Sequence, residues 1–420
     1  MSETPILDLE QEPPKTRHPW AVLLLVVPIN TAIFLAPLYA DMITPDAPSF
    51  NALLWLPAIY VGIAIHELGH LLAGKLVGMD PGGISVGGFR FFKSGERWVF
   101  RFDGRLLISG FAKPLLAKGD FRRAPQAWMV AGGPIASLLF LGVCTLATFQ
   151  LGGGTWDWIG SLFWGATLGL TSLIPYSGGG LKSDASLLWQ LLRHPEASHR
   201  WIALLALQTE ETKGALPRDW DPELMKEVLN VEESQPHYTF AQLLAFYRNA
   251  DQRNTPTALQ HLENAIAAAA RTGNRRLRMA CFLEAAAATA RERNNANGAR
   301  VWLERAKKLQ KPESTAGIEA EISMAEGRYG DALGHWASAR DFIRKRRLDS
   351  GLARFAKERI SEREKACHAA LSRGETAGEF TSSDVLNGDP FPKQPRRFPW
   401  LTVAAIAIVG ITILVVISLR

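Results

Sequence analysis

The stretch that decides the fold is NALLWLPAIYVGIAIHELGHLLAGKLVGM, residues 51–79. Its length and its apolar residues predict a helix that crosses a lipid bilayer, yet His66, Glu67 and His70 lie near its middle. Burying such groups in lipid is unfavourable by several kcal/mol unless a metal, a partner or trapped water compensates. Ionisable residues in a membrane span therefore indicate a functional site.

Residues 66–70 read HELGH, an instance of the pattern HExxH. Residues four apart share one face of a helix, so His66 and His70 can bind one ion while Glu67 reaches a water on that ion. Zinc metalloproteases use this arrangement, in which the ion acidifies the water and the carboxylate takes its proton. We predict a zinc ion (Zn²⁺) at the two histidines and Glu67 as the catalytic base; a structural polar cluster is the alternative. The small Gly69 allows another backbone or a ligand to approach.

The composition divides the chain into regions suited to two solvents. The 420 residues suffice for two or three domains, and the first half and the last twenty residues are apolar whereas the middle is charged and rich in Ala. The net charge of +6 fits basic cytoplasmic loops better than a nucleic-acid surface, since no basic run is interleaved with stacking aromatics. We expect no nucleic-acid partner. The three scattered cysteines predict neither a disulfide framework nor a thiolate metal site.

Further apolar segments predict a polytopic membrane helix bundle. After a disordered tail at 1–19, spans are expected at about 20–40, 51–79, 126–151 and 155–192, and a C-terminal transmembrane helix at 399–420. A cleaved signal peptide is the alternative for the first of these. We predict a multi-pass protein of a bacterial-type cell membrane. The basic loop 80–125 and the basic residues before the last span place the N-terminus and residues 194–373 on the cytoplasmic side.

The loop 80–125 has a strand-like pattern. The segments ISVGGFRFF, RWVFRF and RLLISGFA are separated by residues 93–96 and by Asp103-Gly104, which are turn signals. We predict a small membrane-associated antiparallel β-sheet. A free edge of that sheet could accept an extended substrate segment by strand addition, or the sheet could be only a structural cap.

The fourth apolar segment is not one straight helix. Residues 175–180, PYSGGG, break it, and Ser183 fits the N-cap of a new helix whose first turn contains Asp184. Irregular backbone at membrane depth is tolerated only where protein or a cavity surrounds it. Asp184 is therefore the natural third metal ligand, although an ordinary place in the first turn of a cytoplasmic helix would also suit it. In the span before, Gly132-Gly133-Pro134 permits close helix contact, which core packing explains.

These residues resemble the site-2 protease family of intramembrane zinc metalloproteases. The resemblance covers about residues 50–193 and rests on the HELGH motif, on Gly133-Pro134 in the next span, and on the break at 172–175 followed by Ser183-Asp184. It implies that two histidines and an aspartate hold zinc, that the glutamate is the catalytic base, and that a transmembrane substrate is cleaved in or at the edge of the bilayer. These roles fall on His66, His70, Asp184 and Glu67.

The chain departs from the family pattern at two positions. Ser172 stands where the family has an asparagine that helps to position substrate or polarise its carbonyl, and Ala185 stands where it has a glycine. Ser172 is thus the candidate for substrate or oxyanion support, and reduced activity or unusual specificity is expected. The alternative function is a catalytically weakened protease homologue that acts as a membrane-anchored helical-repeat scaffold.

Residues 194–373 are rich in helix formers, with breaks near 254–256, 273–274, 294–297, 311–312 and 327. Three segments share the pattern A-x3-L/W-x2-A, beginning at Ala258, Ala299 and Ala332, and the separations of 41 and 33 residues are near the period of tetratricopeptide-type (TPR-like) repeats. We predict a cytoplasmic helical repeat domain, with an unrelated helical bundle as the alternative. The concave face of such an array would dock a protein or peptide. Residues 374–398 read as a flexible linker.

The predicted protein is therefore mainly α, with a membrane bundle, a small sheet and a cytoplasmic repeat domain. Its predicted function is that of a zinc metalloendopeptidase, a hydrolase that cuts a membrane-spanning protein substrate within the lipid bilayer. The helical domain would recruit or regulate substrates.

Overall fold

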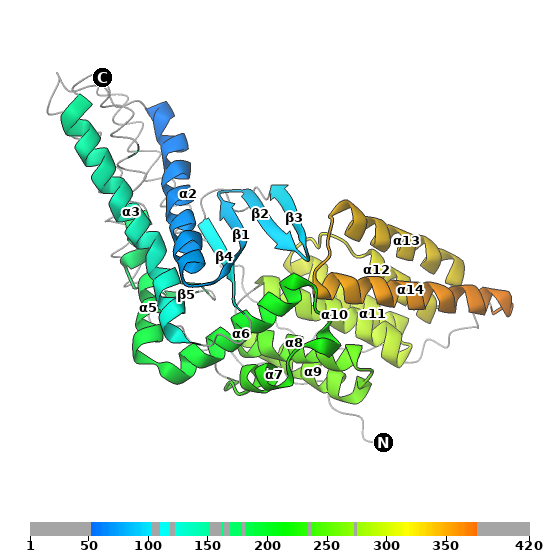
Figure 1. Ribbon diagram of the computed structural model, residues 1–420. Helices are drawn as coiled ribbons and strands as arrows, with labels where there is room; N and C mark the ends of the chain where they lie inside the picture. Colours follow the sequence, from blue (N-terminus) through cyan, green and yellow to red (C-terminus); the bar gives the residue numbers. More distant parts are fainter. Residues whose placement is uncertain are drawn as a thin grey trace. The chain divides into compact units, whose positions relative to one another are not determined.

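The computed structural model describes residues 52–102, 110–117, 122–151, 162, 169–175, 177–178, 181–233, 237–272 and 275–375. The tail 1–19, the spans predicted at 20–40 and 399–420, most of the linker 374–398 and the turn at Asp103-Gly104 lie outside the described residues. Within the described part, the chain is mainly helical and contains a small antiparallel sheet (Figure 1). This confirms the predicted fold class at that level.

Two long apolar helices, α2 (Ala52–Leu76) and α3 (Arg123–Leu151), lie side by side (Figure 1). They meet at small residues, because a Cβ atom on Gly69 would overlap the Gly132 carbonyl and one on Gly132 would overlap the Cβ atom of Ala73. Backbones approach this closely only where side chains are missing or small. The predicted role of Gly69 in close backbone approach is confirmed.

One helix in the described part, Arg123–Ala147 within α3, is long and apolar enough to cross a membrane. Several of its large apolar side chains are exposed, including Leu139, Val143 and Leu146. A single such helix is a weak indication of membrane association, because the core helix of a soluble protein passes the same test. The multi-pass arrangement and its orientation stay predictions.

The sheet lies between α2 and α3 in the sequence and has the strand order β3-β2-β1-β4. Its strands are β1 (Asp80–Val86), β2 (Phe89–Ser94), β3 (Arg97–Phe102) and β4 (Gly110–Leu115). The turn predicted at 93–96 is shorter than expected: it lies at Gly95-Glu96, where Gly95 adopts a φ of +61°, whereas Lys93 and Ser94 belong to β2. Gly87, with a φ of +56°, divides the segment 84–92 into two strands. β4 pairs with β1, so β3 and β4 are the two edges.

One face of the sheet carries five exposed aromatic side chains. Phe91 lies opposite Phe100 and Phe89 lies opposite Phe102, so these pairs point to the same side. Trp98 stacks on Phe91 with ring centroids 4.6 Å apart. We call these five residues the aromatic face. Exposed apolar patches of this kind mark interaction or membrane surfaces.

The predicted break in the fourth apolar segment is confirmed. The short helix η2 (Thr171–Leu173) ends at an extended Ile174, and β5 (Ser177–Gly178) pairs with β6 (Leu181–Lys182) in a small hairpin. Helix α5 (Asp184–Arg193) follows, packed against α3. The predicted cap is also confirmed, because the Ser186 N–H donates a 3.3 Å hydrogen bond to the Ser183 hydroxyl oxygen.

The predicted helical region folds into a series of helices. They are α6 (Pro195–Lys213), η3 (Pro217–Asp219), α7 (Pro222–Leu229), α8 (Tyr238–Asp251), α9 (Thr255–Thr272), α10 (Arg275–Arg293), α11 (Ala296–Leu309), α12 (Ala316–Ala325), α13 (Tyr329–Lys345) and α14 (Gly351–Ser372). The predicted breaks that lie in described residues separate neighbouring helices.

Helices α8 to α13 pack as consecutive pairs, α8 with α9, α10 with α11 and α12 with α13, and α10 also contacts α9 and α12. The repeated pattern falls on the second helix of each pair. All nine of its side chains are buried, namely Ala258, Leu262, Ala265, Ala299, Leu303, Ala306, Ala332, Trp336 and Ala339. The pattern therefore marks the packing face of these helices.

Helix α14 packs against α13 and α6, and some of its side chains reach the first helices of these pairs. Arg363 binds the buried Glu321 of α12 with its Nη2 atom 2.6 Å from Oε2, and Glu362 pairs with Arg253 at the end of α8. Burial and the nearby charge of Arg291 on α10 lower the pKa of Arg359 on α14 to about 10. Side chains of α14 thus form ion pairs with α12 and with Arg253 just after α8.

The sheet rests on helix α6. The Lys113 ammonium donates a 2.6 Å hydrogen bond to the Thr212 hydroxyl, and the Leu116 N–H donates one of 3.1 Å to Thr209. At the other end of the sheet, the Asp349 N–H donates to the Ser94 hydroxyl at 2.8 Å. Edge strand β4 is consequently held between α2 and α6.

Candidate metal centre

The three predicted metal ligands come together at one point. His66 and His70 lie one turn apart on α2, and Asp184 reaches them from the first residue of α5. The distance between His66 Nε2 and Asp184 Oδ2 is 3.0 Å, and that between His70 Nε2 and Asp184 Oδ1 is 3.6 Å. The two Nε2 atoms are 3.2 Å apart. Asp184 thus lies in the first turn of a helix, and its carboxylate also contacts both histidines.

The other ring nitrogen of each histidine has its own partner. His66 Nδ1 lies 3.0 Å from the buried Ser137 hydroxyl, and His70 Nδ1 lies 3.0 Å from the Met129 carbonyl oxygen, so His70 donates from Nδ1. The Gly133 N–H also faces His70 Nδ1 at 3.3 Å, but within α3 it has the Met129 carbonyl as its own i−4 partner. The proton on His70 Nδ1 leaves the Nε2 lone pair of His70 directed at Asp184. The Ser137 hydroxyl can accept from His66 Nδ1 and so hold His66 in the same tautomer.

This donor set fits a small divalent cation. Two imidazole nitrogens and a carboxylate are the ligand types that zinc accepts, and atoms about 2.0–2.1 Å from a tetrahedral ion stand roughly 3.3 Å apart. The observed separations of 3.0 to 3.6 Å bracket that value, although the two histidines approach different oxygens of Asp184. When one oxygen of Asp184 is taken as the ligand, it and the two histidine nitrogens lie within 4.8 Å of one another. When both Nε2 atoms are unprotonated, they converge with the carboxylate as acceptors, and a cation would balance them.

Two glycines, one in α3 and one before η2, lie against the paired imidazole rings. A Cβ atom on Gly133 would overlap His70 Nε2 and lie 2.8 Å from His66 Nε2. A Cβ atom on Gly169, before η2, would overlap the Ser137 hydroxyl and lie 3.1 Å from His66 Nδ1. Glycine at these two positions therefore leaves room for the paired imidazoles.

Replacing Gly133 with Ala is expected to weaken binding of a divalent cation, tested with zinc, at least about 10-fold, as does loss of a group that orients metal ligands. The added methyl group would push the Nε2 atoms apart. Zinc titration against a competing chelator measures the change. The matched control is Gly142→Ala in the same helix, where a Cβ atom meets nothing within 4 Å. That variant should keep wild-type affinity and fold at least as stably, since Ala favours helix by up to about 1 kcal/mol. Equal affinities in the two variants would contradict this assignment.

Glu67 is buried next to the same point and faces strand β4. The Ala112 N–H donates a hydrogen bond to its carboxylate. A Cβ atom on Gly110 would overlap that carboxylate, so the strand passes directly over it. Glu67 thus lies between the histidine pair and an edge strand of the sheet.

Ser172 lies beside the third ligand. Its hydroxyl oxygen is 2.9 Å from the Gly169 carbonyl and is also in hydrogen-bond contact with the Asp184 carboxylate. One hydroxyl proton can serve only one of these acceptors at a time. The structure therefore brings every sequence-predicted site residue together, with Ser172 next to Asp184.

Sequence reasoning missed Ser137, Met129 and the role of Gly133. Core packing was the explanation offered for the Gly132-Gly133-Pro134 run, whereas Gly133 also touches both imidazoles. The available signal was the spacing Gly133-x3-Ser137, which puts a hydroxyl one turn after a glycine on the face of the span next to the HELGH helix.

No protein-family model matches the chain, and no curated protein or solved structure matches it either.

Proposed function

We propose that this protein is an intramembrane zinc metalloendopeptidase that hydrolyses a peptide bond of a membrane-anchored protein. The observation that carries the proposal is the convergence of His66, His70 and Asp184 with Glu67 buried beside them. Two helices and a broken segment would not assemble two imidazoles and two carboxylates in an apolar bundle without a chemical use, because burying them is costly.

The residues present suit the chemistry of peptide hydrolysis. When bound, zinc would lower the pKa of water and polarise the carbonyl group of a peptide. Glu67 would accept the proton of the attacking water and return it to the amine that leaves. Ser137 and the Met129 carbonyl hold the two imidazole rings in place. The Ser172 hydroxyl would support the substrate carbonyl.

Edge strand β4 offers a way to hold the substrate. Strand β4 pairs with β1 on one side, and the N–H of Ala112 on β4 donates a hydrogen bond to the Glu67 carboxylate. Because α2 and α6 pack against β4, an extended peptide would have to displace part of this packing to pair with the strand beside the Glu67 carboxylate. Because strand addition reads the backbone, it would favour substrates that are locally unfolded.

The exposed apolar surfaces support a position in the lipid bilayer. Besides α3, the outer side of α2 exposes Leu68, Leu72 and Leu76, and the aromatic face adds rings that suit the membrane interface. We propose a multi-pass protein with its N-terminus and helical domain in the cytoplasm and its sheet in contact with lipid.

Brominated lipids are expected to quench Trp98, because it belongs to the aromatic face. The protein would be reconstituted in bilayer nanodiscs, and the quenched share of its fluorescence would be compared between wild type and Trp98→Phe. We expect the variant to lose part of that share. The control Trp302→Phe removes a tryptophan of α11 that packs on Phe282, and it should leave the quenched share unchanged. Identical losses in both variants would argue against lipid contact at the sheet.

We further propose that α8 to α13 form a TPR-like array. The consecutive pairing and the buried pattern residues support it. A partner protein would bind this domain, and substrates could be selected through it.

Coexpression with single-span membrane proteins tests the function directly. The enzyme should yield a substrate fragment whose formation stops when a membrane-permeant zinc chelator is added and resumes with zinc. If every candidate substrate stays intact while the helical domain still captures a partner, the scaffold function takes its place.

A further inference from the structure

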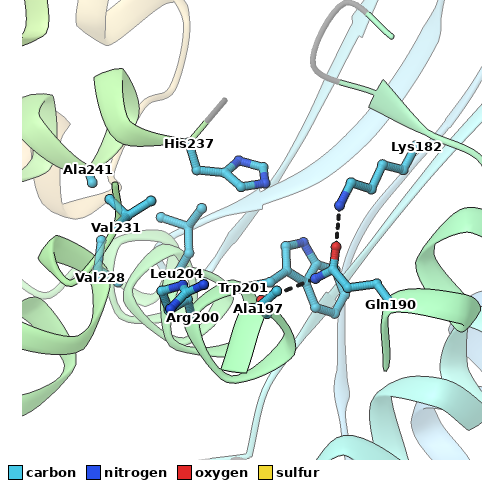
Figure 2. A pocket seen from close by; sticks show the side chains of 10 residues that line it. All are labelled: Lys182, Gln190, Ala197, Arg200, Trp201, Leu204, Val228, Val231, His237 and Ala241. Atoms are coloured by element: carbon cyan, nitrogen blue, oxygen red, sulfur yellow. Dashed lines mark hydrogen bonds between the residues drawn. The ribbon is translucent and has the colours of Figure 1, made fainter. Parts of the chain in front are cut away.

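A cavity of about 70 Å³ lies where α5, α6, α7 and α8 meet (Figure 2). None of the three residues of the metal centre lines it. Its apolar wall includes Trp201 and Leu204, and its polar lining consists of Lys182, Gln190, Arg200 and His237. The volume is several times the roughly 10–15 Å³ that one water needs. The cavity can therefore hold a small polyatomic ligand.

The polar lining is basic. Lys182 comes from β6, Arg200 from α6 and His237 from the start of α8, and no carboxylate is among the lining residues that the structure describes. Burial and the charge of Lys182 lower the pKa of His237, so these two groups repel each other when both are protonated. Within the described part of the chain, Arg200 forms no ion pair. An anion in the cavity would offset the repulsion among these three basic side chains.

The hydrogen-bond donors at the cavity are in part already oriented. Figure 2 shows the Lys182 ammonium donating to the Gln190 amide oxygen, while the Gln190 amide nitrogen donates to the Ala197 carbonyl at 3.1 Å. The lysine retains two further protons for a ligand. Helix α8 begins beside the cavity, and the side chain of its N-cap residue, His237, makes no capping hydrogen bond. The N-terminus of a helix adds positive potential.

We infer that this cavity binds a phosphate-sized oxyanion, held by Lys182 and Arg200 and assisted by His237. Such an ion would connect β6, which ends two residues before Asp184, to helices α6 and α8. The same phosphate chemistry could come from a free phosphate or from the head group of an anionic phospholipid. The inference is independent of the proposed protease function, because it concerns binding alone.

Thermal unfolding of the purified full-length chain in neutral detergent tests the inference. Inorganic phosphate is expected to raise Tm saturably at constant ionic strength, whereas chloride should not. Lys182→Gln and Arg200→Gln should each weaken phosphate binding at least tenfold. The matched control is Lys226→Gln on α7, an exposed lysine outside the cavity, which should behave as wild type. Calorimetric titration with phosphate gives a second measure of the same affinities.

The source of the phosphate is tested with nanodiscs of phosphatidylcholine, with and without phosphatidic acid. A Tm rise with phosphatidic acid but not with free phosphate, lost in Arg200→Gln, would identify the head group. If a Gln variant does not fold, Arg200→Lys keeps the charge and should retain binding with lower affinity. Tm rises that are absent for both probes, or equal in wild type and both Gln variants, would overturn the inference.

Discussion

Replacing Glu67 with Gln is expected to reduce peptide-bond cleavage by about 10²- to 10⁴-fold, the usual contribution of a general acid–base group. The amide of glutamine keeps the size of the side chain but cannot accept the proton of the attacking water. It can still accept the hydrogen bond from the Ala112 N–H, so the contact with β4 should survive. The variant should therefore fold, bind substrate and lack activity.

The measurement is the rate of fragment formation from one substrate in the same detergent or nanodisc preparation. Zinc content should remain that of the wild type, since Glu67 is not one of the three ligands. The matched control is Glu96→Gln, which replaces an exposed glutamate at the β2–β3 turn. This variant should cleave the substrate at the wild-type rate. If the Glu67→Gln chain produced the fragment at the wild-type rate, Glu67 would not be the base.

Replacing Asp184 with Asn is expected to lower zinc affinity by at least about 100-fold. Loss of a group that merely orients a ligand already weakens metal binding by about 10- to 100-fold, and here the only carboxylate of the triad is removed. The asparagine keeps the helix start, because the cap of α5 is Ser183. The loss would thus reflect the metal site and not the fold around it.

Metal analysis after equilibration with a zinc buffer measures this effect. His66→Ala, which removes a ligand from the other helix, should give a similar loss. Asp219→Asn in η3 replaces an exposed aspartate and should leave zinc at one equivalent per chain. Undiminished zinc in Asp184→Asn would remove this residue from the ligand set and with it the proposed enzyme.

The part of the site that lies within one segment could be predicted from the sequence. The spacing of His66 and His70 determines their shared helix face, and the run after Pro175 predicts a break before Asp184. Such features depend on local geometry. The contact of Asp184 with the histidines follows from them only if the segments pack together, which the resemblance to a known family suggested.

The remaining features depend on contacts between distant segments. Ser137 reaches His66 because Gly69 and Gly132 let two helices approach, and no local pattern records which helix faces meet. Strand β4 pairs with β1 across two intervening strands, where local turn signals favour sequential hairpins. The repeat pattern predicted the packing faces of α9, α11 and α13, but it did not predict that α14 packs on α13 and forms an ion pair with Glu321 of α12.

A partner protein that binds the helical domain where α14 packs would compete with α14 for that surface. A protein that binds the face under α14 must first replace the ion pairs of Arg363 and Glu362 with its own. Its apparent affinity then equals its intrinsic affinity multiplied by the fraction of molecules in which α14 has detached. Weak binding measured on the intact chain would therefore reflect the free energy needed to detach α14 as well as the intrinsic affinity of the partner.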